Sequence, residues 1–166
     1  MVDCRWLPGL EEYDGSNEWI NYENYLYDIF CNDFKNTHPT FENKNVVIRY
    51  HPIENGKEEA FYHVTCQDYM KDGYRVPDFR RCERIRWVRK FIENYCCDTN
   101  ICKACSGVKV WSEPYKANTR VHIMLEEEKY MVVVEPRESY CLLITAFYFD
   151  QGHRLRNALN RYNKYK

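Results

Sequence analysis

The sequence predicts an α+β fold with N-terminal helices and a short strand pair, followed by a four-stranded antiparallel meander and a C-terminal helix. Residues 17–34 and 78–95 repeat apolar side chains every three or four positions, which is typical of amphipathic helices. From residue 108 onward the apolar period changes to two, in segments joined by short links. The 166 residues contain no long linker and no internal repeat. We therefore expect one domain over 1–166, with an acidic helical segment over 1–44 and a core over 45–166.

In the first half of the chain the expected elements are two helices and a strand pair. The helix over 17–34 follows Ser16, a residue type that caps helix N-termini. Segments 45–51 and 59–66 are rich in β-branched and aromatic residues, and we expect a strand pair joined by the turn Glu54-Asn55-Gly56. Pro77 precedes the helix over 78–95. Its expected buried stripe is Phe79, Cys82, Ile85, Val88, Ile92 and Tyr95, and its arginines lie off that stripe.

Four strands and one helix are expected in the second half. The strands cover 108–111, 119–125, 130–135 and 140–149. Their links are short enough to require antiparallel neighbours. The last helix, over 153–165, should turn one face to the core, namely Leu155, Ala158, Leu159 and Tyr162.

Charge is unevenly distributed, although the net charge is only −1. Residues 11–42 carry eight acids and one lysine, whereas 75–90 carry seven bases and two acids. Residues 151–166 carry five bases and no acid. A polyanion responds to local patches because salt screens charge beyond roughly 8–10 Å. The near-neutral total therefore does not exclude a nucleic-acid partner, although solvated helix faces would give the same pattern.

The chain has nine cysteines, an odd number that favours reduced thiols in the cytoplasm over a disulfide framework. We expect no secretory signal, because 1–10 contain Asp3, Arg5 and Pro8 without an apolar core, and no run is long enough to span a membrane. Cys102 and Cys105 have the spacing of a zinc knuckle. A structural zinc site would use Cys97, Cys102 and Cys105 with Cys96 or Cys82; the alternative is a loop of free thiols.

Three places could carry chemistry. His63 and Thr65 would share one face of a strand, where an imidazole beside a hydroxyl can exchange protons. Arg120 and His122 share the polar face of another strand, where an arginine could hold a phosphate. Thr145 is a hydroxyl in an apolar strand that pairs with the segment ending in Glu135 and Arg137. Each of these also has a purely structural interpretation. No P-loop, dinucleotide fingerprint, serine-hydrolase or zinc-protease motif is present, so chemistry on phosphates would use His and Arg.

Residues 58–165 resemble the phage- and toxin-associated nucleases of the barnase/EndoU/colicin/RelE-like superfamily. The resemblance rests on Phe61-Tyr62-His63-Val64-Thr65, on the arginine-rich 75–87, on Arg120-Val121-His122, and on the two final strands around Val132–Glu135 and Leu142–Tyr148, followed by His153-Arg154-Leu155. It implies helices followed by a four-stranded antiparallel sheet, and metal-independent RNA cleavage by attack of the ribose 2′-hydroxyl.

The resemblance implies roles for particular residues. His63 would be the acid/base group, and Arg120 with Arg84 or Arg81 would stabilise the phosphate. Thr145 would bind the phosphate or orient the histidine. Substrate-binding candidates are Arg81, His122, Arg137, Tyr148 and Arg154. We expect an RNA partner, an antitoxin or other protein partner, no membrane, and no cofactor apart from the zinc discussed above. The alternative is a non-catalytic nucleic-acid- or protein-binding module of the same fold, with or without zinc.

Overall fold

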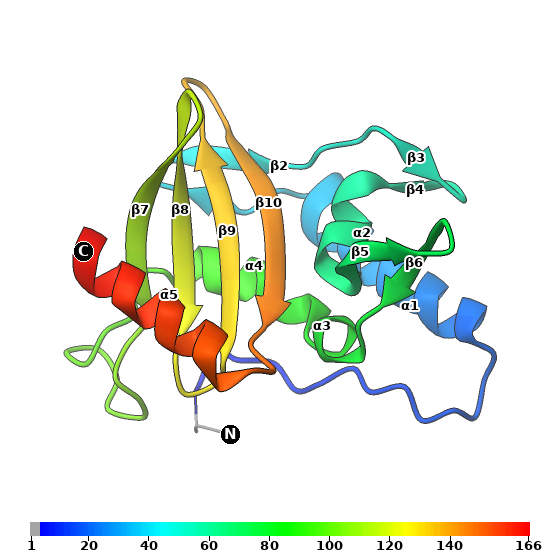
Figure 1. Cartoon of the computed structure of the whole chain (residues 1–166), viewed down its shortest axis with the longest axis horizontal. Helices are drawn as coiled ribbons and strands as arrows, with labels where there is room; N and C mark the ends of the chain where they lie inside the picture. Colours follow the sequence, from blue (N-terminus) through cyan, green and yellow to red (C-terminus); the bar gives the residue numbers. More distant parts are fainter. Residues whose placement is uncertain (1–3) are drawn as a thin grey trace.

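One six-stranded sheet organises the chain, and helices lie against both of its faces (Figure 1). The computed structural model describes residues 4–166. The helices are α1 (Trp19–Cys31), the π-helical turn η1 (Asn32–Asn36), α2 (Glu59–Thr65), α3 (Phe79–Glu83), α4 (Ile85–Glu93) and α5 (Gly152–Tyr165). The strands are β1 (Thr40–Phe41), β2 (Lys44–Val47), β3 (Ile53–Glu54), β4 (Lys57–Glu58), β5 (Cys66–Lys71), β6 (Tyr74–Pro77), β7 (Lys109–Tyr115), β8 (Asn118–Leu125), β9 (Tyr130–Pro136) and β10 (Cys141–Tyr148).

The strand order in the sheet is β1-β2-β10-β9-β8-β7. The four strands β7 to β10 pair antiparallel in sequence order, which confirms the expected meander. The sheet is larger than the sequence predicts, because β2 adds to β10 in parallel and β1 extends it by one more strand. The pairs β3–β4 and β5–β6 form separate hairpins outside this sheet.

Side chains alternate between the two faces of the sheet along β8 and β9. The inner face, with Val121, Ile123, Val132 and Val134, is buried in one core with α1, α2 and α4. The outer face carries Trp111, Met124, Met131 and Val133, which form a second core with Phe149 and Ala158. The expected inner residues of the last helix pack there, which confirms that prediction. Figure 1 shows α5 crossing one end of the outer face and leaving the other end open.

Most of the segment 59–66 is a helix, so the prediction of a strand there is wrong. Residues 59–65 form α2, which packs against β10 and buries Ala60, Phe61 and Val64. Burial in the inner core outweighs the strand preference of these aromatic and β-branched residues. His63 and Thr65 therefore do not share a strand face. The turn Glu54-Asn55-Gly56 is correct in position, but it joins the short strands β3 and β4. The expected strand over 45–51 is reduced to β2.

The helix expected over 78–95 is interrupted at Arg84, which has φ −104° and ψ 20° and separates α3 from α4. Asp78 caps α3 by accepting bonds from the backbone N–H groups of Arg80 and Arg81. Because of this break, some residues expected to be exposed are buried, and one residue expected to be buried is exposed. Arg81 and Arg84 are buried, whereas Phe79 is about half exposed.

The N-terminal segment crosses α4 before α1 begins. The indole of Trp87 donates to the carbonyl of Pro8, and Trp6 packs edge-on against Phe91. Glu11 accepts a bond from Arg86 at 2.6 Å, so one acidic residue of this segment pairs with the arginine-rich helix. The expectation of no leader rests partly on Asp3, which lies outside the described residues. Within residues 4–166, no helix combines the length and the apolar character needed to cross a membrane.

Candidate functional site

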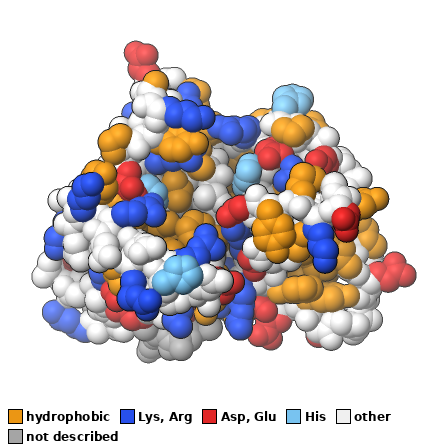
Figure 2. Space-filling model, in the orientation of Figure 1, with side chains coloured by type: hydrophobic (Ala, Val, Ile, Leu, Met, Phe, Trp, Pro, Cys, Tyr) orange, Lys and Arg blue, Asp and Glu red, His pale blue; other side chains and the backbone are white. Residues whose placement is uncertain are grey.

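The open end of the outer face holds two adjoining pockets, which we call the sheet-face groove. The first, about 270 Å³, is lined by polar groups of Glu113, Arg120, His122, Thr145 and Arg161 and by the rings of Tyr115 and Phe147. The second, about 210 Å³, shares Tyr115 and Arg120 and adds Arg49, Lys116, Glu135 and Arg137. The predicted residues Arg120, His122, Thr145 and Arg137 thus meet in one place. Figure 2 views this face and shows a hollow with Lys and Arg side chains along its edges.

At the first pocket, His122 belongs to a cluster that joins β7, β8 and α5. Its ring stacks on Trp111 with centroids 4.9 Å apart. Glu113 accepts bonds from both Nε and Nη2 of Arg161 and from the indole of Trp111 at 2.8 Å. Arg161 Nη2 also lies 3.3 Å from His122 Nε2. The same Nε2 lies 3.4 Å from a carboxylate oxygen of Glu113, so this ring nitrogen faces both members of the Arg161–Glu113 pair.

Two opposing shifts fix the charges of this cluster. Burial lowers the pKa of His122 to about 4; Glu113 acts in the opposite direction, and Arg161 adds to the lowering. Burial would raise the pKa of Glu113, but the bonds from Arg161 and Trp111 outweigh it and the pKa is lowered. At neutral pH the imidazole is therefore neutral and the carboxyl is ionised. The first pocket then presents a neutral histidine beside an arginine–carboxylate pair.

The second pocket is built on the buried carboxylate of Glu135. It accepts a bond from Arg120 Nε at 3.3 Å and bonds from Nε and Nη2 of Arg137. Burial would raise the pKa of Glu135, but these bonds lower it below its ordinary value. The Arg120 guanidinium also lies over the Tyr115 ring, 3.4 Å from its centroid. Glu135 neutralises one of the two arginines, so with Arg49 and Lys116 this pocket keeps an excess of positive charge.

His63 lies on α2 and lines neither of the two pockets. Its Nε2 lies 3.0 Å from Glu59, and Arg75 holds the other oxygen of that carboxylate. With Nε2 donating to Glu59, the Nδ1 lone pair of a neutral imidazole is free to accept a proton. Burial lowers the pKa of His63 and Glu59 raises it, while Arg75 and Arg49 lower it further. His63 is therefore within electrostatic reach of Arg49, which lines the second pocket.

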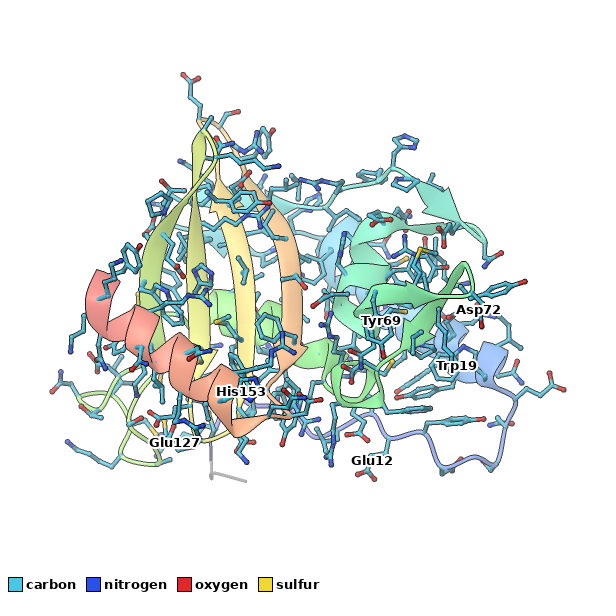
Figure 3. The ribbon with its side chains drawn as sticks, viewed as in Figure 1. Glu12, Trp19, Tyr69, Asp72, Glu127 and His153 are labelled. Atoms are coloured by element: carbon cyan, nitrogen blue, oxygen red, sulfur yellow. The ribbon has the colours of Figure 1, made fainter. Side chains whose placement is uncertain are left out.

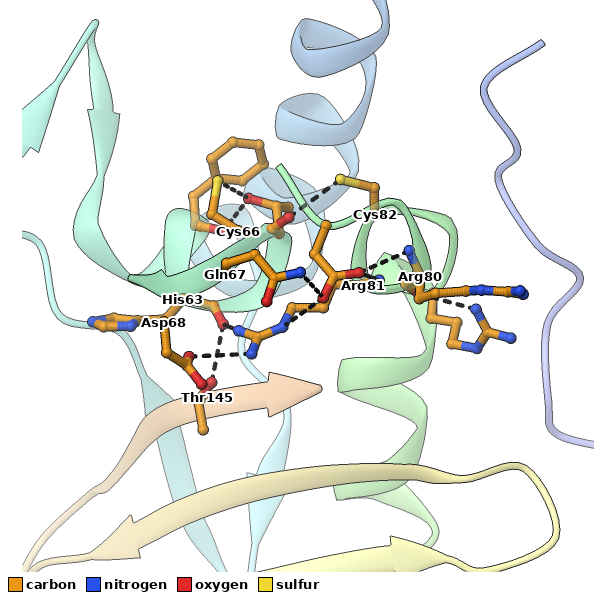
Figure 4. A network of polar contacts seen from close by, with 12 residues as sticks. His63, Cys66, Gln67, Asp68, Arg80, Arg81, Cys82 and Thr145 are labelled. Atoms are coloured by element: carbon orange, nitrogen blue, oxygen red, sulfur yellow. Dashed lines mark hydrogen bonds and ion pairs between the residues drawn. The ribbon is translucent and has the colours of Figure 1, made fainter. Parts of the chain in front are cut away.

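Thr145 links α2 to the groove. Its hydroxyl donates to the backbone carbonyl of His63 at 3.0 Å, and its own position in β10 is set by a bulge between Leu143 and Thr145. The same carbonyl accepts a second bond from Arg81 Nη1 at 3.1 Å. Figure 4 shows these contacts converging on the His63 backbone, with the imidazole directed away from Arg81. Thr145 therefore holds the backbone of α2 at His63, and it makes no contact with the imidazole ring in this set of bonds.

The other predicted arginines have different surroundings. Arg81 also pairs with Asp68 and Asp78, so its guanidinium is occupied inside the fold. Arg84 bonds to the Arg80 carbonyl and lies over the rings of Trp87 and Tyr148, 4.5 Å from the Tyr148 centroid.

The structure therefore does not bring Arg81 or Arg84 into the groove with Arg120. Tyr148 faces the α3 arginines instead of the pockets. Arg154 lies over Phe147, at the end of the first pocket nearest α5.

The cysteine candidates lie elsewhere. Cys97, Cys102 and Cys105 occupy the loop between α4 and β7, and all nine cysteines are free thiols. As their side chains stand, no three Cys, His, Asp or Glu residues within 4–166 are gathered to hold a metal ion.

Sequence reasoning missed Glu113 and Arg161, and Glu113 was missed because the strand expected over 108–111 ends too early. A strand expected to end at Trp111 leaves Glu113 in a loop, whereas β7 continues to Tyr115. Extending the alternation from Trp111 puts Glu113 and Tyr115 on the same face, and that signal was available. Arg161 could be placed only by knowing where α5 packs.

Comparison with known proteins adds no relative. No family model matches the chain, and neither a curated protein nor a solved structure matches it.

Proposed function

We propose that the protein is a metal-independent endoribonuclease that binds RNA in the sheet-face groove and cleaves it by attack of the 2′-hydroxyl. The observation that carries this proposal is a groove lined by cationic groups, next to a helix whose histidine is oriented by a carboxylate. Arg120 and Thr145 line one pocket, and the Thr145 hydroxyl donates a hydrogen bond to the backbone carbonyl of His63.

In this proposal His63 is the general base. Glu59 orients its ring through Nε2, which leaves Nδ1 to accept the proton of the 2′-hydroxyl. The 2′-oxygen then attacks the adjacent phosphorus, the bond from phosphorus to the 5′-oxygen breaks, and that oxygen takes up a proton. The products are a 2′,3′-cyclic phosphate and a free 5′-hydroxyl. His122 is less suited to this role, because it is buried against Trp111.

The phosphate would be held by Arg120, with Arg137 and Arg49 beside it. Arg120 is already fixed by Glu135 and by the Tyr115 ring, so it pays little ordering entropy when it binds a second oxyanion. Its planar guanidinium can donate to two phosphate oxygens at once. Tyr115, which is about 40% exposed, offers a surface on which a base of single-stranded RNA could stack. Arg81 supports this site from inside the fold, through its bond to the His63 carbonyl.

The test is to incubate the purified protein with RNA in EDTA and identify the ends of the fragments. We expect fragments with 2′,3′-cyclic phosphate ends, loss of cleavage in His63→Ala, and retained cleavage in His122→Ala. Glu59→Gln is the companion variant, because it keeps the shape of the pair but weakens the orientation of the ring. Cleavage that survives both histidine changes, or that EDTA abolishes, would overturn the proposal. His153→Ala, on an exposed histidine, is the matched control.

A second candidate function is RNA binding without cleavage. It is favoured by the pairing of three groove arginines with the groove's own carboxylates, Arg120 and Arg137 with Glu135 and Arg161 with Glu113. Such pairing suits a surface that orients phosphates without transferring protons. RNA that is bound by the wild type and weakened by Arg120→Ala, but never cut, would establish this function instead.

A further inference from the structure

The backbone of the cysteine-rich loop between α4 and β7 is held by hydrogen bonds. The proposed ribonuclease chemistry does not use this loop. Asp98 organises its first turn: its side chain accepts from the N–H groups of Asn100 and Ile101, and its carbonyl accepts from Cys102 N–H at 3.0 Å. Val108 then donates to the Cys97 carbonyl at 2.9 Å. These bonds bring the two ends of the loop together and place Cys97 beside the segment that carries Cys105.

Two of the thiols accept hydrogen bonds from the backbone two residues further on. Ala104 N–H points to the Cys102 sulfur at 3.4 Å, and Gly107 N–H points to the Cys105 sulfur at 3.3 Å. Backbone donors directed at sulfur stabilise the negative charge of a thiolate, which is the form that binds metal. Gly107 allows the second turn, because its φ is +92° and a Cβ there would lie 3.2 Å from the Asp98 Cα. The loop thus has two knuckle-like turns.

A fourth thiol comes from the start of the chain. Burial raises the pKa of Cys4, bonds from the backbone of Trp6 and Leu7 lower it, and the charges of the Cys97 and Cys105 thiols raise it. The Cys4 thiol is thus within electrostatic reach of Cys97 and Cys105, and the backbone of Trp6, two residues further on, influences it from the same side of the sequence as in the loop turns. Figure 1 places the N-terminal end and this loop at the same end of the molecule. Glu127, labelled in Figure 3, lies at that end too and accepts a bond from the Ser106 N–H at 2.8 Å.

The two other cysteines considered from the sequence do not fit. Cys82 is fully buried between α2 and α3, where its sulfur bonds to the Thr65 carbonyl at 3.4 Å. Cys96 is exposed on the loop, next to Tyr95. Four thiols remain in one region: Cys4, Cys97, Cys102 and Cys105.

We propose that Cys4, Cys97, Cys102 and Cys105 bind one zinc ion, which fastens the N-terminal segment to the loop between α4 and β7. Four cysteines fill the tetrahedral shell of zinc and leave no position for substrate, so the ion is structural. Binding converts the thiols to thiolates and releases their protons to water, with no change of oxidation state. The side chains must rotate towards one another to close the site, while the backbone turns that direct N–H groups at sulfur are already formed.

The zinc site would add to the contacts that already hold the N-terminal segment. Among the contacts that hold residues 4–11 are the bond from Trp87 to Pro8, the packing of Trp6 on Phe91 and the pair of Glu11 with Arg86. One metal ion would tie this segment, through coordinate bonds, to a loop that is distant from it in the sequence.

The test measures metal content, so its outcome is independent of RNA cleavage. The full chain is purified without chelators, its zinc is quantified, and the metal-free protein is titrated with Co²⁺ to record the visible and charge-transfer bands of a tetrahedral thiolate site. We expect one zinc per chain and a four-thiolate cobalt spectrum. Cys96→Ser, next to a proposed ligand, is the matched control and should leave both unchanged.

Cys4→Ser and Cys102→Ser should each weaken metal binding more than about tenfold, since even partners of ligands cost that much. Three results would overturn the proposal: wild-type protein that binds neither ion, a Cys4→Ser variant with the wild-type metal content and cobalt spectrum, or a disulfide from Cys4 to Cys97 or Cys105 in protein purified under reducing conditions. Cobalt titration of the wild type needs no variant to fold, so the proposal stays testable if a serine variant is unstable.

Discussion

Protonation of His122 should be a main source of acid destabilisation in this protein. Burial against Trp111 and α5 lowers the pKa of His122 to about 4, from an ordinary value of 6.5. Below pH 6.5 His122 therefore binds a proton in the unfolded chain, whereas in the folded chain it stays neutral until the pH approaches 4. This contribution to stability is fully present above pH 6.5 and is lost as the pH falls towards 4.

The size of the effect follows from that difference in pKa. It corresponds to about 3 kcal/mol of folding free energy lost between pH 6.5 and pH 4. His122→Gln keeps a polar side chain but removes the titrating group. The variant is less stable at pH 7, because it loses the stacking on Trp111, yet its stability should depend less on pH over this window by about the same 3 kcal/mol.

Urea unfolding at several pH values between 4 and 7 measures this slope directly. His63 titrates with a lowered pKa in the wild type and in the variant alike, so its contribution cancels in the comparison. His153→Gln, at an exposed position in α5, is the control and should retain the wild-type slope. Identical slopes for the wild type and His122→Gln would show that the imidazole is not held neutral in the fold.

Three further changes test the groove and the loop. Thr145→Val should lower the free energy of unfolding by about 1 kcal/mol in urea titration, because one hydrogen bond is lost while the His63 carbonyl keeps its second donor. An unchanged free energy of unfolding would contradict the hydrogen bond from Thr145 to the His63 carbonyl. Glu135→Gln should cost about 2 kcal/mol by thermal unfolding, because both charge-assisted bonds weaken; an unchanged Tm would contradict this. Gly107→Ala should cost at least about 1 kcal/mol because of its positive φ, whereas Gly9→Ala, with open space around it, should cost less.

The second half of the fold could be predicted from the sequence because its signal is local. Strands β7 to β10 alternate apolar and polar residues and are joined by short links, so period and link length together define the meander. The same alternation placed Arg120 and His122 on one face of β8. The edge strand β2 could not be predicted with its partner, because its pairing with β10 depends on contacts between distant parts of the chain.

Local sequence preference does not predict the structure where burial decides it. The segment Phe61-Tyr62-His63-Val64-Thr65 has the composition of a strand, yet it forms α2 because it packs between β10 and the other helices. Arg84 lies off the expected buried stripe of its helix, but a break at this residue buries its guanidinium over Trp87. The His63–Glu59 pair follows directly from the helix, since residues four apart face each other only in that conformation.

Cleavage of one RNA oligonucleotide, compared with the same oligonucleotide carrying a 2′-deoxy sugar at the cut site, tests the central claim most directly. The 2′-hydroxyl is the proposed nucleophile, so we predict cleavage of the RNA and none at the deoxy position, with binding to both. Equal cleavage of the two oligonucleotides, or no cleavage of the RNA, would contradict the account.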